Sequence, residues 1–307
     1  MFKKILFATT GEPSCDDAAR VAFDISKRYK AELTVFHVLG LPSRGFGQRI
    51  IDSRTGEEVS SDDDYVQWVK EELKNTYERQ LKDSSGVQLE ALSGATHTEI
   101  LRFARKQDVD LIIMGSCSEM DENGNFNCNR GTGRTLQLVA KSARCPVLVI
   151  GRPVASFWGG FSNIVFGTDF SQSCEFAFQF AYKTAKKLGC KLHIFHALDI
   201  SSIHSGRMMA QNEIEDKLME ARDRIKKKYI PKLQGFDDYE IEVWEGIPYV
   251  EIVKFAREKL ADLVVMAHHT RSRDPERDLL GSTLEQAALR ATCPVMSVNR
   301  PDKIKNL

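Results

Sequence analysis

Hydrophobic and polar residues follow two alternating patterns along this chain: short apolar runs, and longer stretches with the period of a helix. The run Lys4–Thr9 is apolar between its ends, as in a strand that is buried on both faces of a parallel sheet. From about Ser14, apolar residues recur at helical spacing, and Asp16 and Asp17 occupy the first turn. Residues 33–38 form a second run, rich in β-branched and aromatic side chains. The pattern predicts strand, helix and strand in succession.

The same alternation continues to about residue 151. A long helix is expected from Asp62, because large apolar residues recur every four positions: Val69, Leu73, Tyr77 and Leu81. The other expected elements are strands at roughly 87–93, 110–115 and 147–151 and helices at roughly 97–107 and 133–143. Such alternation predicts an α/β fold in which helices flank a doubly wound parallel sheet.

The chain then repeats itself. Residues 2–39 align without a gap on residues 161–198, and about a third of the aligned positions are identical. Two further blocks match in the same order, 109–114 with 261–266 and 145–147 with 293–295. The difference in residue number between matched positions of the two halves changes only between the matched blocks, where loops tolerate a change of length. We therefore predict two similar domains, 1–152 and 160–301, with Glu213–Lys232 as the long helix of the second and Gly151–Gly160 as the linker.

Composition excludes several classes of partner. The 43 Lys and Arg balance the 43 Asp and Glu, so no net charge directs the chain to nucleic acid or to an anionic membrane. No apolar run approaches the roughly 18 residues of a membrane span, and the N-terminus lacks the cleavage site of a signal peptide. The seven cysteines show no paired spacing, which favours reduced thiols and a cytoplasmic location.

Ligands of open parallel sheets bind at the carboxyl ends of the strands, so the residues that end the first and fourth strands are the candidates. Those segments begin at Thr10 and Met114 in the first half and at Asp169 and Met266 in the second. A glycine near a hydroxyl residue also opens each last helix, in Gly133-Arg134-Thr135 and in Gly281-Ser282-Thr283. Such a start either presents backbone N–H groups to an anion or serves only as a helix cap.

Several motifs occur in one order in both halves. The first strands read Ile-Leu-Phe-Ala-Thr-Thr-Gly and Ile-Val-Phe-Gly-Thr-Asp-Phe-Ser, and the second strands read Val-Phe-His-Val-Leu and Ile-Phe-His-Ala-Leu. Asp-Leu-Ile-Ile-Met-Gly-Ser forms a fourth strand, and Gly-Ser-Thr-Leu-Glu-Gln precedes Ala-Thr-Cys-Pro-Val near the end. This combination resembles the universal stress protein family over nearly all of both halves. The chain is similar to a tandem universal stress protein.

The resemblance implies a five-stranded sheet of order 3-2-1-4-5 in each half, with pairing through the last strands. Some members of the family bind ATP or AMP through an Asp after strand one, the backbone of strand two and a Gly-x2-Gly-x9-Gly-Ser loop after strand four. Carried over to this chain with their neighbours, the cofactor-binding positions are Asp169, Ala197, Met266, Ala267, Gly281, Ser282 and Thr283 in the second half and Val38, Gly115 and Gly133 in the first.

Neither half keeps the whole family pattern. The first has Thr10 in place of the Asp and Arg134 in place of the Ser, and Gly115 and Gly133 are 18 positions apart where the family has 13. The second keeps Asp169 and the Gly-Ser pair, at a nearly standard spacing of 14, but has Ala267 for the first glycine and Thr270 for the second. Nucleotide binding is therefore expected more in the second half.

Other polar segments allow both a structural and a functional interpretation. The loop with His268, His269, Arg271, Arg273 and Arg277 is either a solvated loop or a phosphate clamp. The insertion around Cys117 and Cys128 favours a polar turn over a metal site or a redox pair. His37 and His196 are expected as satisfied core or interface histidines and not as catalytic bases, and Cys145-Pro146 and Cys293-Pro294 are expected to be structural.

The leading hypothesis is a stress-response or signalling module that binds an adenine nucleotide. The alternative is a nucleotide-independent interaction scaffold whose two halves imitate a homodimer. An enzyme is disfavoured, with slow ATP hydrolysis as the upper limit, because the chain has no GxxxxGK[ST] phosphate loop or catalytic grouping. No metal is expected beyond nucleotide-bound magnesium. Protein partners and a further homodimer stay open.

Overall fold

The computed structural model describes residues 1–39, 49–51, 58–60, 63–116, 133–152, 161–200, 209–268, 283–300 and 302–304. The described strands of the first half are β1 (Lys4–Ala8), β2 (Glu32–Val38), β3 (Arg49–Ile51), β4 (Glu58–Ser60), β5 (Val87–Leu92), β6 (Leu111–Gly115) and β7 (Val147–Ile150). Its helices are η1 (Pro13–Cys15), α1 (Asp16–Tyr29), α2 (Asp63–Thr76), α3 (Glu78–Lys82), α4 (Thr96–Lys106) and α5 (Arg134–Ser142).

The second half repeats this series of elements. Its described strands are β8 (Asn163–Gly167), β9 (Lys191–Leu198), β10 (Tyr239–Glu245), β11 (Leu263–Met266) and β12 (Val295–Ser297). Its helices are α6 (Ser173–Leu188), α7 (Gln211–Tyr229), η3 (Ile230–Lys232), α8 (Pro248–Glu258) and α9 (Thr283–Arg290). The predicted α/β fold is confirmed, and the same order of strands and helices recurs in the second half.

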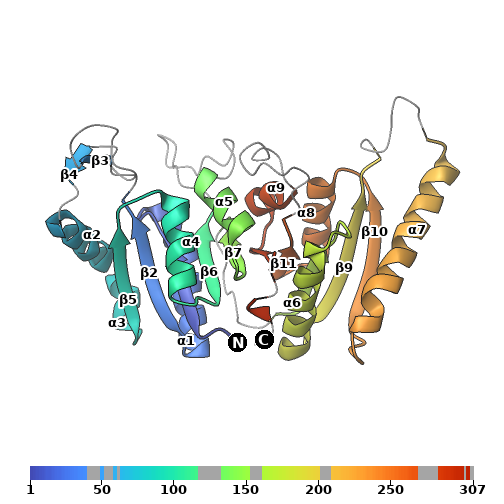
Figure 1. Ribbon diagram of the computed structural model, residues 1–307. Helices are drawn as coiled ribbons and strands as arrows, with labels where there is room; N and C mark the ends of the chain where they lie inside the picture. The colour runs from blue at the N-terminus through green and yellow to red at the C-terminus, as the bar shows by residue number, and fades with distance from the viewer. Residues whose placement is uncertain are drawn as a thin grey trace.

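One sheet runs through both domains (Figure 1). Its order is β10-β9-β8-β11-β12-β7-β6-β1-β2-β5, so each half has the expected order 3-2-1-4-5. The strands within each half are parallel, whereas β7 and β12 pair in antiparallel fashion, Val149 opposite Val295. The last strands of the two domains therefore join them, as the resemblance implied. A separate hairpin, β3 with β4, has no counterpart in the sequence predictions.

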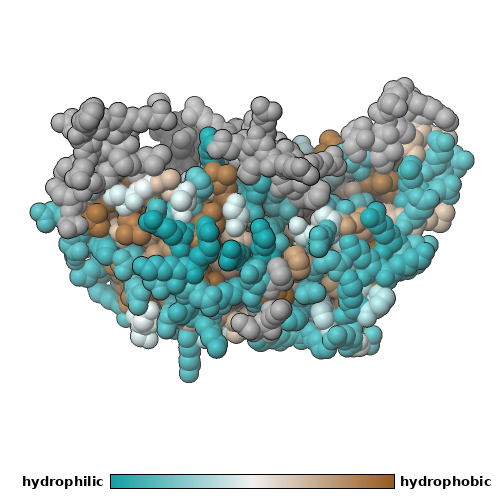
Figure 2. Space-filling view, in the orientation of Figure 1, coloured by the Kyte–Doolittle hydropathy of each residue, from teal (hydrophilic) through white to brown (hydrophobic). Residues whose placement is uncertain are grey.

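Helices cover both faces of this sheet because successive strand residues point to opposite sides. Phe7 belongs to the core beneath α1, α2, α6 and α7, whereas its neighbours Leu6 and Ala8 belong to the core beneath α4, α5, α8 and α9. Both cores continue across the β7–β12 junction. Hydrophilic residues cover most of the described surface seen in Figure 2, as amphipathic helices require.

One predicted helix is divided in the structure. The long helix expected from Asp62 ends at Thr76, and α3 begins at Glu78. Tyr77 between them is not helical (φ −105°, ψ 19°), and its side chain is fully buried. The four-residue apolar period was therefore correct, but the single helix was wrong. The ring of Tyr77 packs against Phe7 at 5.8 Å between ring centroids.

Candidate functional site

The first domain has a cavity at the carboxyl edge of its sheet. The chain leaves β1 toward β2 on one side, and β6 lies on the other, so the ends of these strands form a topological switch point. A cavity of about 410 Å³ lies there. This volume is within the range of about 300–1,000 Å³ that is typical of small-molecule sites.

The cavity wall has an apolar part and a polar part. The apolar part consists of Ala8, Phe36, Val38, Ile100, Met114 and Leu136. The polar part consists of Thr9, Thr10, Glu12, Cys15, His37, Thr96, Gly115, Ser116, Gly133 and Thr135. The structure therefore brings the three first-domain residues predicted from sequence, Val38, Gly115 and Gly133, to one cavity. Sequence reasoning missed Glu12 and most of the apolar wall.

A buried hydrogen-bond network fixes the loop after β1. The hydroxyl groups of Thr9 and Tyr77 are 2.7 Å apart, and the backbone N–H of Gly11 donates to Thr9 Oγ1 at 3.0 Å. His37 Nδ1 donates to the carbonyl oxygen of Thr9 at 2.9 Å. Gly11 has a φ of +79°, a conformation that costs a glycine little. The network thus ties the loop to Tyr77, between α2 and α3, and to β2.

The second domain contains the same network. The hydroxyl groups of Thr168 and Tyr229 are 2.7 Å apart, Phe170 N–H donates to Thr168 Oγ1 at 3.0 Å, and His196 Nδ1 donates to the Thr168 carbonyl at 2.7 Å. Phe170 takes the left-handed conformation of Gly11, with a φ of +64°. Its ring packs against His196 and lies beneath the guanidinium of Arg224, at 4.6 Å and 4.2 Å respectively. These contacts hold a bulky residue in a conformation that is costly outside glycine.

Asp169 is exposed and lies two residues after the end of β8. Its Oδ1 accepts from the backbone N–H of Ser171 at 2.9 Å and from Cys174 Sγ at 3.0 Å. Burial together with the charge of Asp169 raises the pKa of the Cys174 thiol to about 11. At the matched positions of the first domain, Thr10 Oγ1 lies 3.4 Å from Cys15 Sγ. Thr10 therefore contacts a cysteine as Asp169 does, but it carries no negative charge.

The other second-domain predictions are only partly described. Met266 ends β11 and Ala267 follows it, Ala197 lies in β9, and Thr283 is the first residue of α9. The backbone N–H of His268 donates to Asn299 Oδ1 at 2.7 Å. Gly281, Ser282, His269, Arg271, Arg273 and Arg277 lie outside the described residues, as does the insertion with Cys117 and Cys128.

The two histidines hydrogen-bond within the network, as predicted, and His37 also lines the cavity. Burial lowers the pKa of His196 and so favours its neutral form. Cys145 and Cys293 precede β7 and β12, and burial raises the pKa of both thiols to about 12. Within the described ranges, no three His, Cys, Asp or Glu residues gather as a metal site requires.

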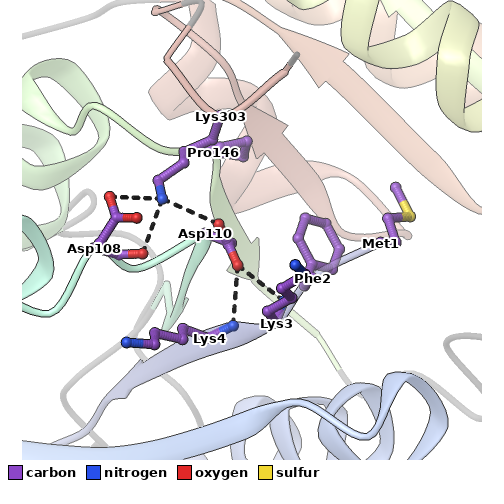
Figure 3. A pocket seen from close by; sticks show the side chains of 8 residues that line it. All are labelled: Met1, Phe2, Lys3, Lys4, Asp108, Asp110, Pro146 and Lys303. Carbon is purple, nitrogen blue, oxygen red and sulfur yellow. Dashed lines mark hydrogen bonds and ion pairs between the residues drawn. The ribbon is translucent and has the colours of Figure 1, made fainter. Parts of the chain in front are cut away.

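A second, smaller cavity lies at the opposite, amino edge of the sheet (Figure 3). It has a volume of about 190 Å³ and is crossed by ion pairs from the C-terminal segment. Lys303 Nζ lies 2.7 Å from Asp108 Oδ1 and 3.2 Å from Asp110 Oδ1, while Asp110 Oδ2 accepts from the backbone N–H groups of Lys3 and Lys4. These contacts fasten the end of the chain to the first domain, so we assign the cavity a structural role.

The family model described as the universal stress protein family matches residues 1–151 and again residues 160–299. The chain belongs to the universal stress protein family. Universal stress protein MJ0531 of Methanocaldococcus jannaschii is 32% identical over 145 residues, which cover 47% of this chain and 85% of that protein. Universal stress protein MJ0577 of the same organism is 29% identical over 160 residues, or 46% of this chain and 96% of that protein.

A solved structure resembles this universal stress protein over its whole length. The crystal structure of a universal stress protein from Archaeoglobus fulgidus has a TM-score of 0.65 and 19% identity, with 97% of each chain covered. At this identity the likeness concerns the fold alone. Within the residues described, no helix is long and apolar enough to cross a membrane.

Proposed function

We propose that this universal stress protein binds an adenine nucleotide, ATP or AMP, at the carboxyl edge of its sheet. The observation that carries the proposal is the 410 Å³ cavity of the first domain, where Val38, Gly115 and Gly133 meet. Its apolar wall suits a purine ring. Backbone N–H groups at Gly133 and the start of α5 suit phosphate oxygens, because a helix N-terminus carries a partial positive charge.

The second domain is proposed as the other nucleotide site, and the sequence favours it. Asp169 lies at the end of β8, beside the strand ends that carry Ala197 and Met266. Its remaining predicted contacts are Gly281 and Ser282. The proposal includes no catalytic step beyond slow hydrolysis, and magnesium enters only as the companion of the nucleotide.

The test uses one matched substitution in each domain. Thr135 and Thr283 occupy equivalent positions in the first turns of α5 and α9, and both are partly exposed. A tryptophan there fills a site without disturbing the buried core. Titration calorimetry of ATP and AMP with the unsubstituted protein, Thr135→Trp, Thr283→Trp and the double variant measures the stoichiometry of each site.

We expect each single variant to lose one site and the double variant to lose both, with unchanged melting in the absence of nucleotide. Mass spectrometry of the gently denatured, purified protein checks for co-purified ATP or AMP. Nucleotide neither co-purified nor bound in the titration would refute the proposal. That result would favour the alternative, an interaction scaffold built on the paired β7 and β12.

A further inference from the structure

Two polar side chains of the second domain cross the domain junction and reach α5 of the first. Ser297 Oγ, in β12, donates to the carbonyl oxygen of Ala140 at 3.0 Å, and Asn299 Nδ2 donates to the same oxygen. Asn299 Nδ2 also lies 3.4 Å from the carbonyl oxygen of Lys141. Both carbonyls belong to the last turn of α5, where an α-helix supplies no backbone partner of its own. The second domain therefore caps a helix of the first.

Asn299 has a further contact within its own domain. Its Oδ1 accepts from the backbone N–H of His268 at 2.7 Å, two residues after the end of β11. Because carbonyl oxygens face Nδ2 and an N–H faces Oδ1, only one orientation of the amide satisfies all of these groups. The amide is planar, so its oxygen cannot move without its nitrogen. Asn299 is thus a rigid bridge between the start of the loop after β11 and the end of α5.

The matched positions of the first domain cannot form this bridge. Val149 corresponds to Ser297 and Gly151 to Asn299, because the two last strands align at one constant spacing. Neither valine nor glycine has a side-chain donor. Gly151 also lies so close to α9 that an added Cβ would be 2.4 Å from the carbonyl oxygen of Ala288. The symmetry of the tandem repeat is therefore broken at this link, which runs from the second domain to α5.

Each end of the bridge leads to one of the two proposed sites. Gly133 directly precedes α5, and both Gly133 and Thr135 in the first turn line the 410 Å³ cavity. In the second domain, Met266 and Ala267 are predicted site positions, and His268 follows them. The nine residues of α5 move as one body, because backbone hydrogen bonds fix the rise at about 1.5 Å per residue. One helix and one side chain therefore connect the cavity with the end of β11.

We propose that Asn299 couples the two sites: a nucleotide in the first-domain cavity restrains α5, and Asn299 passes the restraint to the start of the loop after β11. This inference rests on the proposed function, because it assigns regulation to the same sites. Binding that reduces the motion of a shared element lowers the entropic cost of the next binding event, so the coupling is positive. By linkage, a nucleotide in the second domain strengthens binding in the first by the same factor.

The test measures hydrogen exchange of the His268 amide by NMR while ATP binds to the first domain. Thr283→Trp blocks the second site in every protein compared. The chain has seven histidines, so selective labelling of histidine with nitrogen-15 gives a spectrum of only seven backbone amides. His37 lines the first cavity and reports that ATP has bound, whereas His193, in β9, reports any general change in the second domain. We expect ATP to slow exchange at His268 about fivefold and to leave His193 unchanged.

Three substitutions separate the bridge from the helix cap. Asn299→Asp keeps an oxygen for the N–H of His268 but cannot donate to α5, so exchange at His268 should no longer respond to ATP. Asn299→Gly introduces the matched residue of the first domain and removes both contacts, so it should give fast exchange and no response. Ser297→Val likewise introduces the matched residue but removes only a bond to Ala140, so the fivefold response should remain. Thermal melting without ATP shows whether each variant is folded, and Asn299→Gly provides the test if Asn299→Asp is not.

The outcomes distinguish failure of the coupling from failure of the site. If ATP shifts the His37 signal but leaves exchange at His268 unchanged, the coupling is overturned and the first-domain site stands. A response that persists in both Asn299 variants is carried by another contact, and a response that is also lost in Ser297→Val belongs to the helix cap; either result overturns the role of Asn299. If ATP shifts no histidine signal and produces no heat in titration calorimetry, the first-domain site itself fails, and the coupling fails with it.

Discussion

His193 makes the stability of the second domain depend on pH. The residue lies in β9 with 2% of its surface exposed, its Nε2 2.9 Å from Asn163 Oδ1 and its Nδ1 3.2 Å from Glu240 Oε2. Lys191 and Lys259 each place an ammonium group 3.3 Å from the Glu240 carboxylate and so compete for it. Burial lowers the pKa of His193 from 6.5 to about 4, although Glu240 opposes the shift.

The direction of the effect follows from which state binds the proton. Unfolding returns His193 to its ordinary pKa, so below pH 6.5 the unfolded chain binds a proton that the folded chain does not. Stability is therefore complete above pH 6.5 and falls as the pH falls toward 4, where the folded protein also takes up the proton. With roughly 1.4 kcal/mol per pKa unit, the full loss is about 3 kcal/mol, of which about 2 kcal/mol is lost by pH 5.

The assay compares urea unfolding at pH 7.5 and pH 5.0 in the unsubstituted protein and in His193→Thr. Threonine is the residue at the matched position of the first domain, Thr34, so it is compatible with this strand. The variant loses packing at every pH, but its additional loss at pH 5.0 should be about 2 kcal/mol smaller. Other titrating groups, including His196, are present in both proteins and cancel. Equal pH dependence in the two proteins would refute the reasoning.

Further substitutions test the network and the domain junction. Tyr77→Phe and Tyr229→Phe each remove a buried hydroxyl partner and should cost about 1–2 kcal/mol in chemical unfolding; no loss in either would show that the repeated bond is dispensable. Gly151→Ala should cost about 1–3 kcal/mol, because the added Cβ would lie 2.4 Å from the carbonyl oxygen of Ala288; unchanged melting would contradict that close approach. Cys145 should resist iodoacetamide at pH 8 in the folded protein, since its thiol pKa is about 12; rapid labelling found by peptide mass spectrometry would contradict its burial.

The regular elements were predictable because their signals are local. A strand such as β1 is apolar from Ile5 onward, and a helix such as α1 shows its buried face at helical spacing. The interruption of the helix at Tyr77 could not be predicted from such local signals. The place of Tyr77 in the four-residue period predicted burial, but that period indicated neither the break in the helix nor the contacts with Phe7 and Thr9, which are distant in sequence.

The candidate site was predictable only in part, for a related reason. Gly115 and Gly133 stand at a strand end and a helix start, where a glycine is a visible signal, whereas Val38 was indicated by the family resemblance alone. Phe36 and Leu136 join them only because β2 and α5 converge in space, which spacing along one strand does not indicate. Glu12 carried no such signal, because a single glutamate in the loop after β1 has no spacing that marks a site.

The antiparallel pairing of β7 with β12 occurs within one molecule. Two separate chains joined in this way would dissociate on dilution, whereas a short linker maintains a high effective concentration of each half for the other. A substitution in the gene of a homodimer changes both of its identical subunits. In this chain a substitution changes only one of the two halves. The covalent joint therefore fixes a one-to-one stoichiometry and lets the two halves differ in sequence, as Thr10 and Asp169 do at matched positions.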